Sequence, residues 1–130
     1  MSAVSQLSTK RQLVAIIDDD QSVLRALKRL LDTCGIATEV FDSGEAFLER
    51  DGVNDVACIV LDINLGGISG IEMRRRLSAM GYTIPVIFIT ARDTTVIRKE
   101  AMDAGCVAYL SKPFSGRELI DAIQKATSFF

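Results

Sequence analysis

The sequence has 130 residues, 48% of them hydrophobic and 25% charged, a balance typical of one ordinary globular domain. The net charge of −2 gives no reason to expect direct nucleic acid contact from this chain, and no apolar run approaches the roughly 18 residues of a membrane span. The 3 cysteines lack CxxC spacing and there is no histidine, which argues against a disulfide framework, a zinc site and any Ser-His or Cys-His nucleophile pair.

The beginning of the chain is polar. Residues 1–12, MSAVSQLSTKRQ, are expected to form a flexible N-terminal tail, with a single domain over residues 13–130. The tail does not resemble a signal peptide, so we expect a cytoplasmic protein with no membrane contact. The one basic run, Arg74 to Arg76, falls in a predicted helix, where three adjacent residues spread around most of the circumference and form a solvated face.

The first elements follow in quick succession. Residues 13–17 are a short, continuously apolar run that predicts a strand covered on both faces. Apolar residues then recur at helical spacing over 23–31. Residues 38–41 predict a second strand, and the sequence Asp-Ser-Gly-Glu at 42–45 predicts a capping box that opens a short helix.

The middle of the chain repeats this alternation. Residues 56–61 predict a third buried strand, followed by a loop that contains Gly66 and a second glycine directly after it. A helix is expected around 71–77. A fourth strand is expected at 85–89, with its proline at the entrance, where the ladder needs no donor.

The last third predicts a helix at 96–104, a short strand at 107–110 and a second capping box at 115–118, which opens a final helix. Strands that alternate with helices in this way imply a parallel sheet with helices on both faces. In such sheets, functional groups gather beyond the carboxyl ends of the strands, where the strand order reverses.

Polar side chains stand at those strand ends: Asp18, Asp19, Asp20, Asp62, Thr90, and Ser111-Lys112-Pro113. Asp20 is expected to cap the next helix. Two carboxylates about 5 Å apart, such as Asp18 and Asp19, repel by roughly 3 kcal/mol at an effective dielectric of about 20, and Asp62 adds to this repulsion. A site of this kind usually holds a cation, and oxygen ligands without histidine or thiolate indicate Mg²⁺ or Mn²⁺.

Thr90 and Lys112 are weak indicators when each is taken alone, because threonine is common in strands and most lysines are solvated. Lys112 beside an acidic pocket is more specific, and Pro113 fits a cis peptide bond there. Metal, carboxylate, hydroxyl and ammonium together form the set that phosphoryl transfer needs, since its catalysis is mostly positioning and neutralisation of oxygen charge.

Four stretches carry a family resemblance: IIDDDQSVLRAL, CIVLDINLGGISG, IFITA and AYLSKPF. In order and spacing, from about Leu13 to Phe129, they resemble the signature stretches of two-component response-regulator receiver domains. The resemblance implies a flavodoxin-like (βα)5 three-layer sandwich with a five-stranded parallel sheet of order 2-1-3-4-5. It also implies a signalling domain, not an enzyme, that assists its own phosphorylation and dephosphorylation and switches conformation to control an output. The donor histidine would belong to a sensor histidine kinase or a histidine phosphotransfer protein.

The resemblance also assigns roles at the acidic site. Asp62 would be the phosphoacceptor, and Asp19 and the backbone carbonyl of Asn64 would join Asp62 as Mg²⁺ ligands, with Asp18 acting mainly through a metal-bound water. Many receivers have proline where this chain has Gly66. Two adjacent glycines make the loop easier to deform and costlier to order.

The same resemblance gives Thr90 a hydrogen bond to the phosphoryl oxygens and Lys112 an ion pair with them. Tyr109 would change rotamer together with Thr90. A homodimer contact or an effector domain is then expected on one face of the domain. That face is made by residues 96–104, 107–110 and 117–128.

Other functions remain as alternatives. A receiver-fold protein-binding module would leave the phosphoryl chemistry unused. An aspartate-nucleophile phosphohydrolase normally has an acid/base aspartate two residues after its nucleophile, where this chain has Asn64. A flavin-binding protein would need a phosphate-binding loop after the first strand, where Asp18 to Asp20 would repel the phosphate. The chain is expected to be either a single-domain regulator or a piece that precedes an effector domain.

Overall fold

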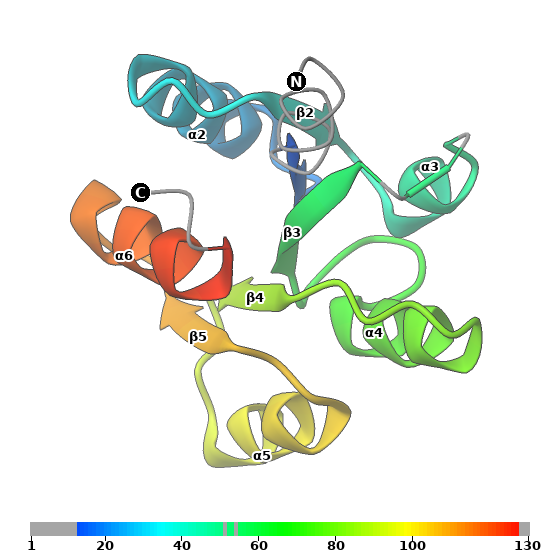
Figure 1. Ribbon diagram of the computed structural model, residues 1–130. Helices are drawn as coiled ribbons and strands as arrows, with labels where there is room; N and C mark the ends of the chain where they lie inside the picture. The colour runs from blue at the N-terminus through cyan, green and yellow to red at the C-terminus, as the bar shows by residue number, and fades with distance from the viewer. Residues whose placement is uncertain (1–12, 51, 54, 128–130) are drawn as a thin grey trace.

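The computed structural model describes residues 13–50, 52–53 and 55–127, and the expected tail at 1–12 lies outside them (Figure 1). The strands are β1 (Leu13–Ile17), β2 (Thr38–Phe41), β3 (Val56–Asp62), β4 (Val86–Thr90) and β5 (Ala108–Ser111). The helices are α2 (Gln21–Thr33), α3 (Gly44–Leu48), α4 (Gly70–Ala79), α5 (Thr95–Ala104) and α6 (Gly116–Thr127). All strand pairs are parallel and the order is β2-β1-β3-β4-β5, which confirms the predicted flavodoxin-like sheet.

The sheet separates two apolar layers. Val14 and Ile16 of β1 pack in the layer that contains α2 and α6, whereas Ala15 and Ile17 pack in the layer that contains α3, α4 and α5. Figure 1 shows these two groups of helices on opposite faces of the sheet. Because both faces are covered, the central strands read as continuous apolar runs without alternation, as expected for a parallel sheet.

Two predicted helix starts are confirmed by side-chain contacts. Asp20 caps α2, and its Oδ1 accepts a hydrogen bond from the Ser22 backbone N–H at 2.9 Å. At α6 the capping box is reciprocal: Ser115 N–H donates to Glu118 Oε1 at 3.0 Å, and Glu118 N–H donates to Ser115 Oγ at 3.1 Å. Both features use partners two or three residues apart, which local sequence can specify.

The capping box predicted at residues 42–45 is wrong. The N-cap of α3 is Ser43, whose hydroxyl accepts from the Ala46 N–H at 3.0 Å. The Glu45 carboxylate instead accepts a hydrogen bond from the backbone N–H of Ile68, in the loop after β3. A tertiary partner therefore replaces the local one at Glu45.

The basic run is also more than a solvated face. Arg75 and Arg76 are exposed, but the Arg74 guanidinium Nε donates to the Gly105 carbonyl at 2.9 Å and so ties α4 to the end of α5.

No helix in the described part of the chain combines the length and the hydrophobicity needed to cross a bilayer. Cys58 lies fully buried in β3, and burial raises the pKa of its thiol to about 12.

The reciprocal box at the start of α6 generates a stability prediction. Ser115→Ala and Glu118→Ala should each lower the free energy of unfolding by about 0.5–2 kcal/mol, because each leaves a backbone N–H without its side-chain acceptor. Urea denaturation of both single variants and the double variant measures this loss. Since the two bonds form one motif, the double variant should lose less than the sum of the two single losses; strict additivity would contradict the reciprocal box.

Candidate functional site

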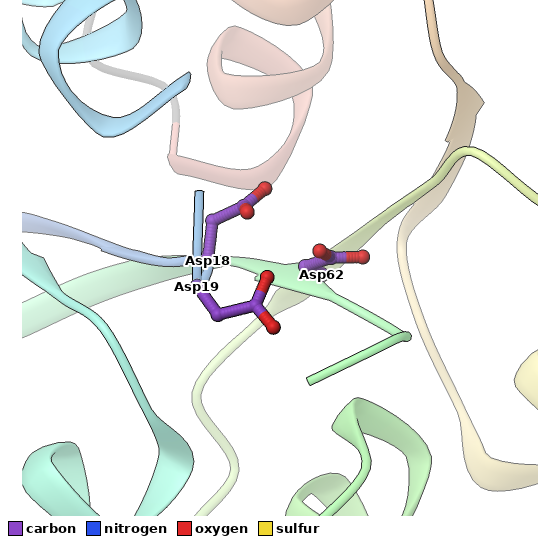
Figure 2. A group of neighbouring side chains, drawn as sticks. All are labelled: Asp18, Asp19 and Asp62. Carbon is purple, nitrogen blue, oxygen red and sulfur yellow. The ribbon is translucent and has the colours of Figure 1, made fainter. Parts of the chain in front are cut away.

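Three carboxylates lie at the carboxyl ends of β1 and β3. Asp18 and Asp19 directly follow β1, Asp62 is the last residue of β3, and each offers an oxygen within 4.8 Å of the others (Figure 2). Asp18 is 0% exposed and Asp62 is 4% exposed, whereas Asp19 is exposed to solvent. The predicted acidic cluster is therefore present, with two members buried.

Lys112 supplies the positive charge that faces these carboxylates. Its Nζ lies 2.8 Å from Asp18 Oδ2 and 3.5 Å from Asp62 Oδ2. The second Asp18 oxygen, Oδ1, accepts the backbone N–H of Asp20 at 2.9 Å. Both oxygens of the Asp18 carboxylate are thus engaged by the protein.

The pKa values of the pair show how burial and charge compete. Burial raises the pKa of the Asp62 carboxyl, and the negative charge of Asp18 raises it further, against the opposing effects of the Asn64 N–H and of Lys112. Burial acts to lower the pKa of the Lys112 ammonium, but the hydrogen bond to Asp18 and the charges of Asp62 and Asp18 outweigh it, so that pKa is raised. Lys112 therefore stays protonated, whereas the Asp62 carboxyl loses its proton at a higher pH than an ordinary aspartate does.

Asn64 connects the Asp62 carboxylate to the end of β4. Its backbone N–H donates to Asp62 Oδ1 at 3.0 Å, and its side-chain Nδ2 donates to Thr90 Oγ1 at 3.2 Å. The fully buried Thr90 hydroxyl also accepts from the backbone N–H of Arg92 at 3.0 Å. The Thr90 hydroxyl is thus held by Asn64 and Arg92, and Asn64 links it to Asp62.

Tyr109 lies outside the acidic cluster, in a second polar network. Its hydroxyl donates to Asp93 Oδ1 at 3.1 Å, and the Arg98 guanidinium carbon lies 4.5 Å from its ring centroid. Asp93 also accepts from Ser111 Oγ at 2.6 Å and from Arg98 at 2.9 Å. These hydrogen bonds, with that of Ser111 the strongest influence, lower the pKa of the Asp93 carboxyl.

The importance of Asp93 was missed from sequence. It lies in the loop after β4, three residues beyond Thr90, where an aspartate is typical of a helix cap, and the cap of α5 proves to be Thr94. Its position at the carboxyl edge of the sheet is the one signal that could have found it.

Gly70 allows α4 to begin against the backbone that carries Asp62. A Cβ at Gly70 would lie 2.9 Å from Ile63 Cα and still closer to the carbonyl oxygen of Asp62, which real Cβ atoms do not tolerate. The Gly70 N–H donates to the Ile63 carbonyl at 3.0 Å, so the loop that follows Asp62 closes back onto its own first residue. This close approach needs glycine.

The structure thus gathers Asp18, Asp19, Asp62, Thr90 and Lys112 at one edge of the sheet, as predicted from the strand ends. Asn64, expected there from the family resemblance, joins them. A nearly buried carboxylate has an ammonium, two further carboxylates and a hydroxyl around it. These groups can hold a divalent cation and neutralise a phosphoryl group, which are the requirements of phosphoryl transfer to a carboxylate.

Comparison with known proteins identifies the family of this chain. Residues 14–124 match the family model of the response regulator receiver domain. The response regulator protein TodT of Pseudomonas putida is 33% identical over 125 residues, which cover 96% of this chain and 55% of TodT. Nodulation protein W of Bradyrhizobium diazoefficiens is 36% identical over 123 residues, which cover 95% of this chain and 54% of that protein.

Among solved structures, the response regulator StyR superposes with a TM-score of 0.81 at 39% identity, covering 89% of this chain and 59% of StyR. The chain spans about half the length of the curated relatives it matches. The family match extends over most of the sequence and includes every strand of the sheet except the first residue of β1. This chain belongs to the receiver-domain family of two-component response regulators, which are signalling domains.

Proposed function

We propose that Asp62 accepts a phosphoryl group from the histidine of a sensor kinase or a histidine phosphotransfer protein. The observation that supports this most directly is the environment of the Asp62 carboxylate, which is 4% exposed and has Lys112 Nζ 3.5 Å from Oδ2. A carboxylate placed at the end of a strand and beside an ammonium can attack a phosphorus atom while the growing oxygen charge is neutralised.

A divalent cation, Mg²⁺ or Mn²⁺, fits the same residues. We assign Asp19, Asp62 and the backbone carbonyl of Asn64 as its ligands, because hard cations prefer oxygen and the three carboxylates come within 4.8 Å of one another. Asp18 acts indirectly, through a metal-bound water, which agrees with the engagement of both its oxygens by Lys112 and Asp20. The cation supplies neutralisation of the carboxylates and of the phosphoryl oxygens.

The chain's own groups then convert phosphorylation into a conformational change. Lys112, fixed by Asp18, forms an ion pair with the phosphoryl group. The Thr90 hydroxyl leaves Asn64 and Arg92 to hydrogen-bond a phosphoryl oxygen, and the vacated space accepts Tyr109 after it leaves Asp93. The output face is the one made by α5, β5 and α6, where a second copy of the chain or an effector domain binds. The chain also assists hydrolysis of its own phosphoryl group.

The phosphohydrolase alternative is not favoured by the site. At the position of the required acid/base, Asn64 has an amide, which holds no titratable proton, and that amide donates to Thr90. The location proposed for the protein is the cytoplasm.

The phosphoacceptor assignment predicts a labelling result. Incubation with acetyl phosphate and Mg²⁺ should add one phosphoryl group to the intact chain, and Asp62→Asn should remove most of this label, because the amide is a poor nucleophile. Intact-protein mass spectrometry measures both. Asp103→Asn, a change in an exposed ion pair on α5, is the control and should label normally. Normal labelling of Asp62→Asn would contradict the assignment.

The raised pKa of Asp62 predicts a pH-dependent stability difference. In the folded state this pKa lies above its unfolded value, so the carboxyl favours folding below about pH 4, and this contribution is lost as the pH rises through the folded pKa. In EDTA near neutral pH, Asp62→Asn should therefore be more stable than wild type by about 1–3 kcal/mol, and the gap should close toward about pH 4.

Urea denaturation across that pH range measures the gap. Asp19→Asn should gain less than Asp62→Asn, because solvent screens the charge of the exposed Asp19. Mg²⁺ should raise the melting temperature of wild type and have little effect on either variant, since each has lost a ligand. An Asp62→Asn protein that is less stable than wild type in EDTA at neutral pH would refute this account.

The proposed switch predicts where the chain responds to activation. Beryllofluoride, a phosphoryl mimic, should change amide hydrogen exchange in α5, β5 and α6, because the Thr90 and Tyr109 contacts that hold this side must be exchanged. Asp93→Ala should weaken the resting hold on Tyr109 and produce part of the same change without beryllofluoride. Changes confined to α2 would show that the output lies on the other side of the domain.

A further inference from the structure

The loop between β3 and α4, residues 63–69, is attached to α3 by one side chain. Glu45 Oε2 accepts a hydrogen bond from the backbone N–H of Ile68 at 3.2 Å, across 23 positions of sequence. Glu45 is exposed to solvent, so its hydrogen bond to Ile68 is not forced by burial of the carboxylate. The bond joins a helix on the periphery to the loop that carries Asn64.

Gly67 is the residue that lets the Glu45 carboxylate reach the loop. A Cβ at Gly67 would lie 2.7 Å from Glu45 Oε1 and 2.9 Å from its Cδ, so any side chain there would displace the carboxylate. A Cβ at Gly66 would meet only Asp19 Oδ2, at an ordinary 3.8 Å. Of the two adjacent glycines, it is therefore Gly67 whose lack of a side chain leaves room for the Glu45 carboxylate.

The Ile68 side chain also packs against α3. A Cβ at Gly44 would lie 3.1 Å from Ile68 Cγ1 and 3.0 Å from Met73 Sδ, so the loop packs closely over the start of α3. The loop is thus held to α3 twice, through the Ile68 backbone by Glu45 and through the Ile68 side chain by Gly44. Two adjacent glycines make a free loop costly to order, and these contacts supply order before anything binds.

We propose that Glu45 is a positioning residue for the phosphorylation site. It holds the loop from Ile63 to Ser69 in the conformation in which Asn64 lies beside Asp62 and Gly66 lies beside Asp19. This inference rests on the proposed function, since it concerns the loop that supplies the Asn64 carbonyl to the cation. Without the Glu45 contact, the binding-competent loop conformation is less populated, and apparent affinity falls by that fraction.

The first test compares Glu45→Ala with Glu45→Gln. Glu45→Ala should raise the apparent Mg²⁺ dissociation constant in isothermal titration calorimetry by roughly threefold to tenfold, the equivalent of one net hydrogen bond. Labelling by acetyl phosphate should slow by a similar factor at subsaturating Mg²⁺ and recover at saturating Mg²⁺, because the ligands themselves remain. Glu45→Gln keeps an acceptor for the Ile68 N–H and should stay within about twofold of wild type. Glu49→Ala, at the C-cap of the same short helix, is the control for loss of a negative charge.

The second test uses the steric relation between Gly67 and Glu45. Gly67→Ala should displace the carboxylate and weaken Mg²⁺ binding about as much as Glu45→Ala does, whereas Gly66→Ala should weaken it less. The double variant Glu45→Ala/Gly67→Ala should be no worse than either single variant, because both remove one contact. Amide exchange at Ile68 should accelerate in Glu45→Ala and Gly67→Ala and not in Glu45→Gln.

Three results would overturn the inference: unchanged Ile68 exchange in Glu45→Ala, unchanged Mg²⁺ affinity in that variant, or a Glu45→Gln protein as impaired as Glu45→Ala. The last result would make Glu45 a source of charge without a positioning role. Failure of the proposed function is separate and visible in wild type, which would then take no label at Asp62. A wild type that labels while Glu45→Ala labels and binds Mg²⁺ equally well removes the role of Glu45 alone.

Discussion

Two buried carboxylates share one ammonium at the end of the central strands, and the rest of the site is arranged around that imbalance. Lys112 lies 2.8 Å from Asp18 and 3.5 Å from Asp62, so one positive charge faces two negative ones, and the exposed Asp19 adds a third. In a region of low dielectric, solvent screens this excess of negative charge only weakly. Burial raises the pKa of Asp62, and the negative charge of Asp18 raises it further. Under the proposed function, a bound cation offsets this excess of negative charge before a phosphoryl group approaches.

The parallel sheet makes this concentration of charge tolerable. β1 and β3 are apolar on both faces, and their backbones pair along their lengths, so the carboxylates project from a stiff support. The adaptable parts lie in the loops: the Asn64 side chain holds Thr90, and Asp93 holds Tyr109. Under the proposed function, the strands hold the reacting groups in place, and exchangeable hydrogen bonds in the loops transmit the change that follows.

Prediction from sequence succeeded where the determining contacts are local or follow from topology. The caps at Asp20 and Ser115 use partners two or three residues away, and strand ends of a parallel sheet necessarily meet at one edge. It failed at Glu45, whose partner Ile68 lies 23 residues away. The roles of Arg74 and Asp93 likewise depend on contacts 31 and 16–18 residues distant, which no local pattern encodes.

Asn64 donates through its backbone to Asp62 and through its side chain to Thr90, so a single residue touches both the acceptor and the first part of the switch. Under the proposed function, the surroundings of the acceptor and the resting position of Thr90 are therefore coupled through one residue. A lineage that replaced the Asn64 side chain would also release Thr90 from this hydrogen bond and so shift the resting balance of the proposed switch. Restoring that balance would require a compensating change at a second position.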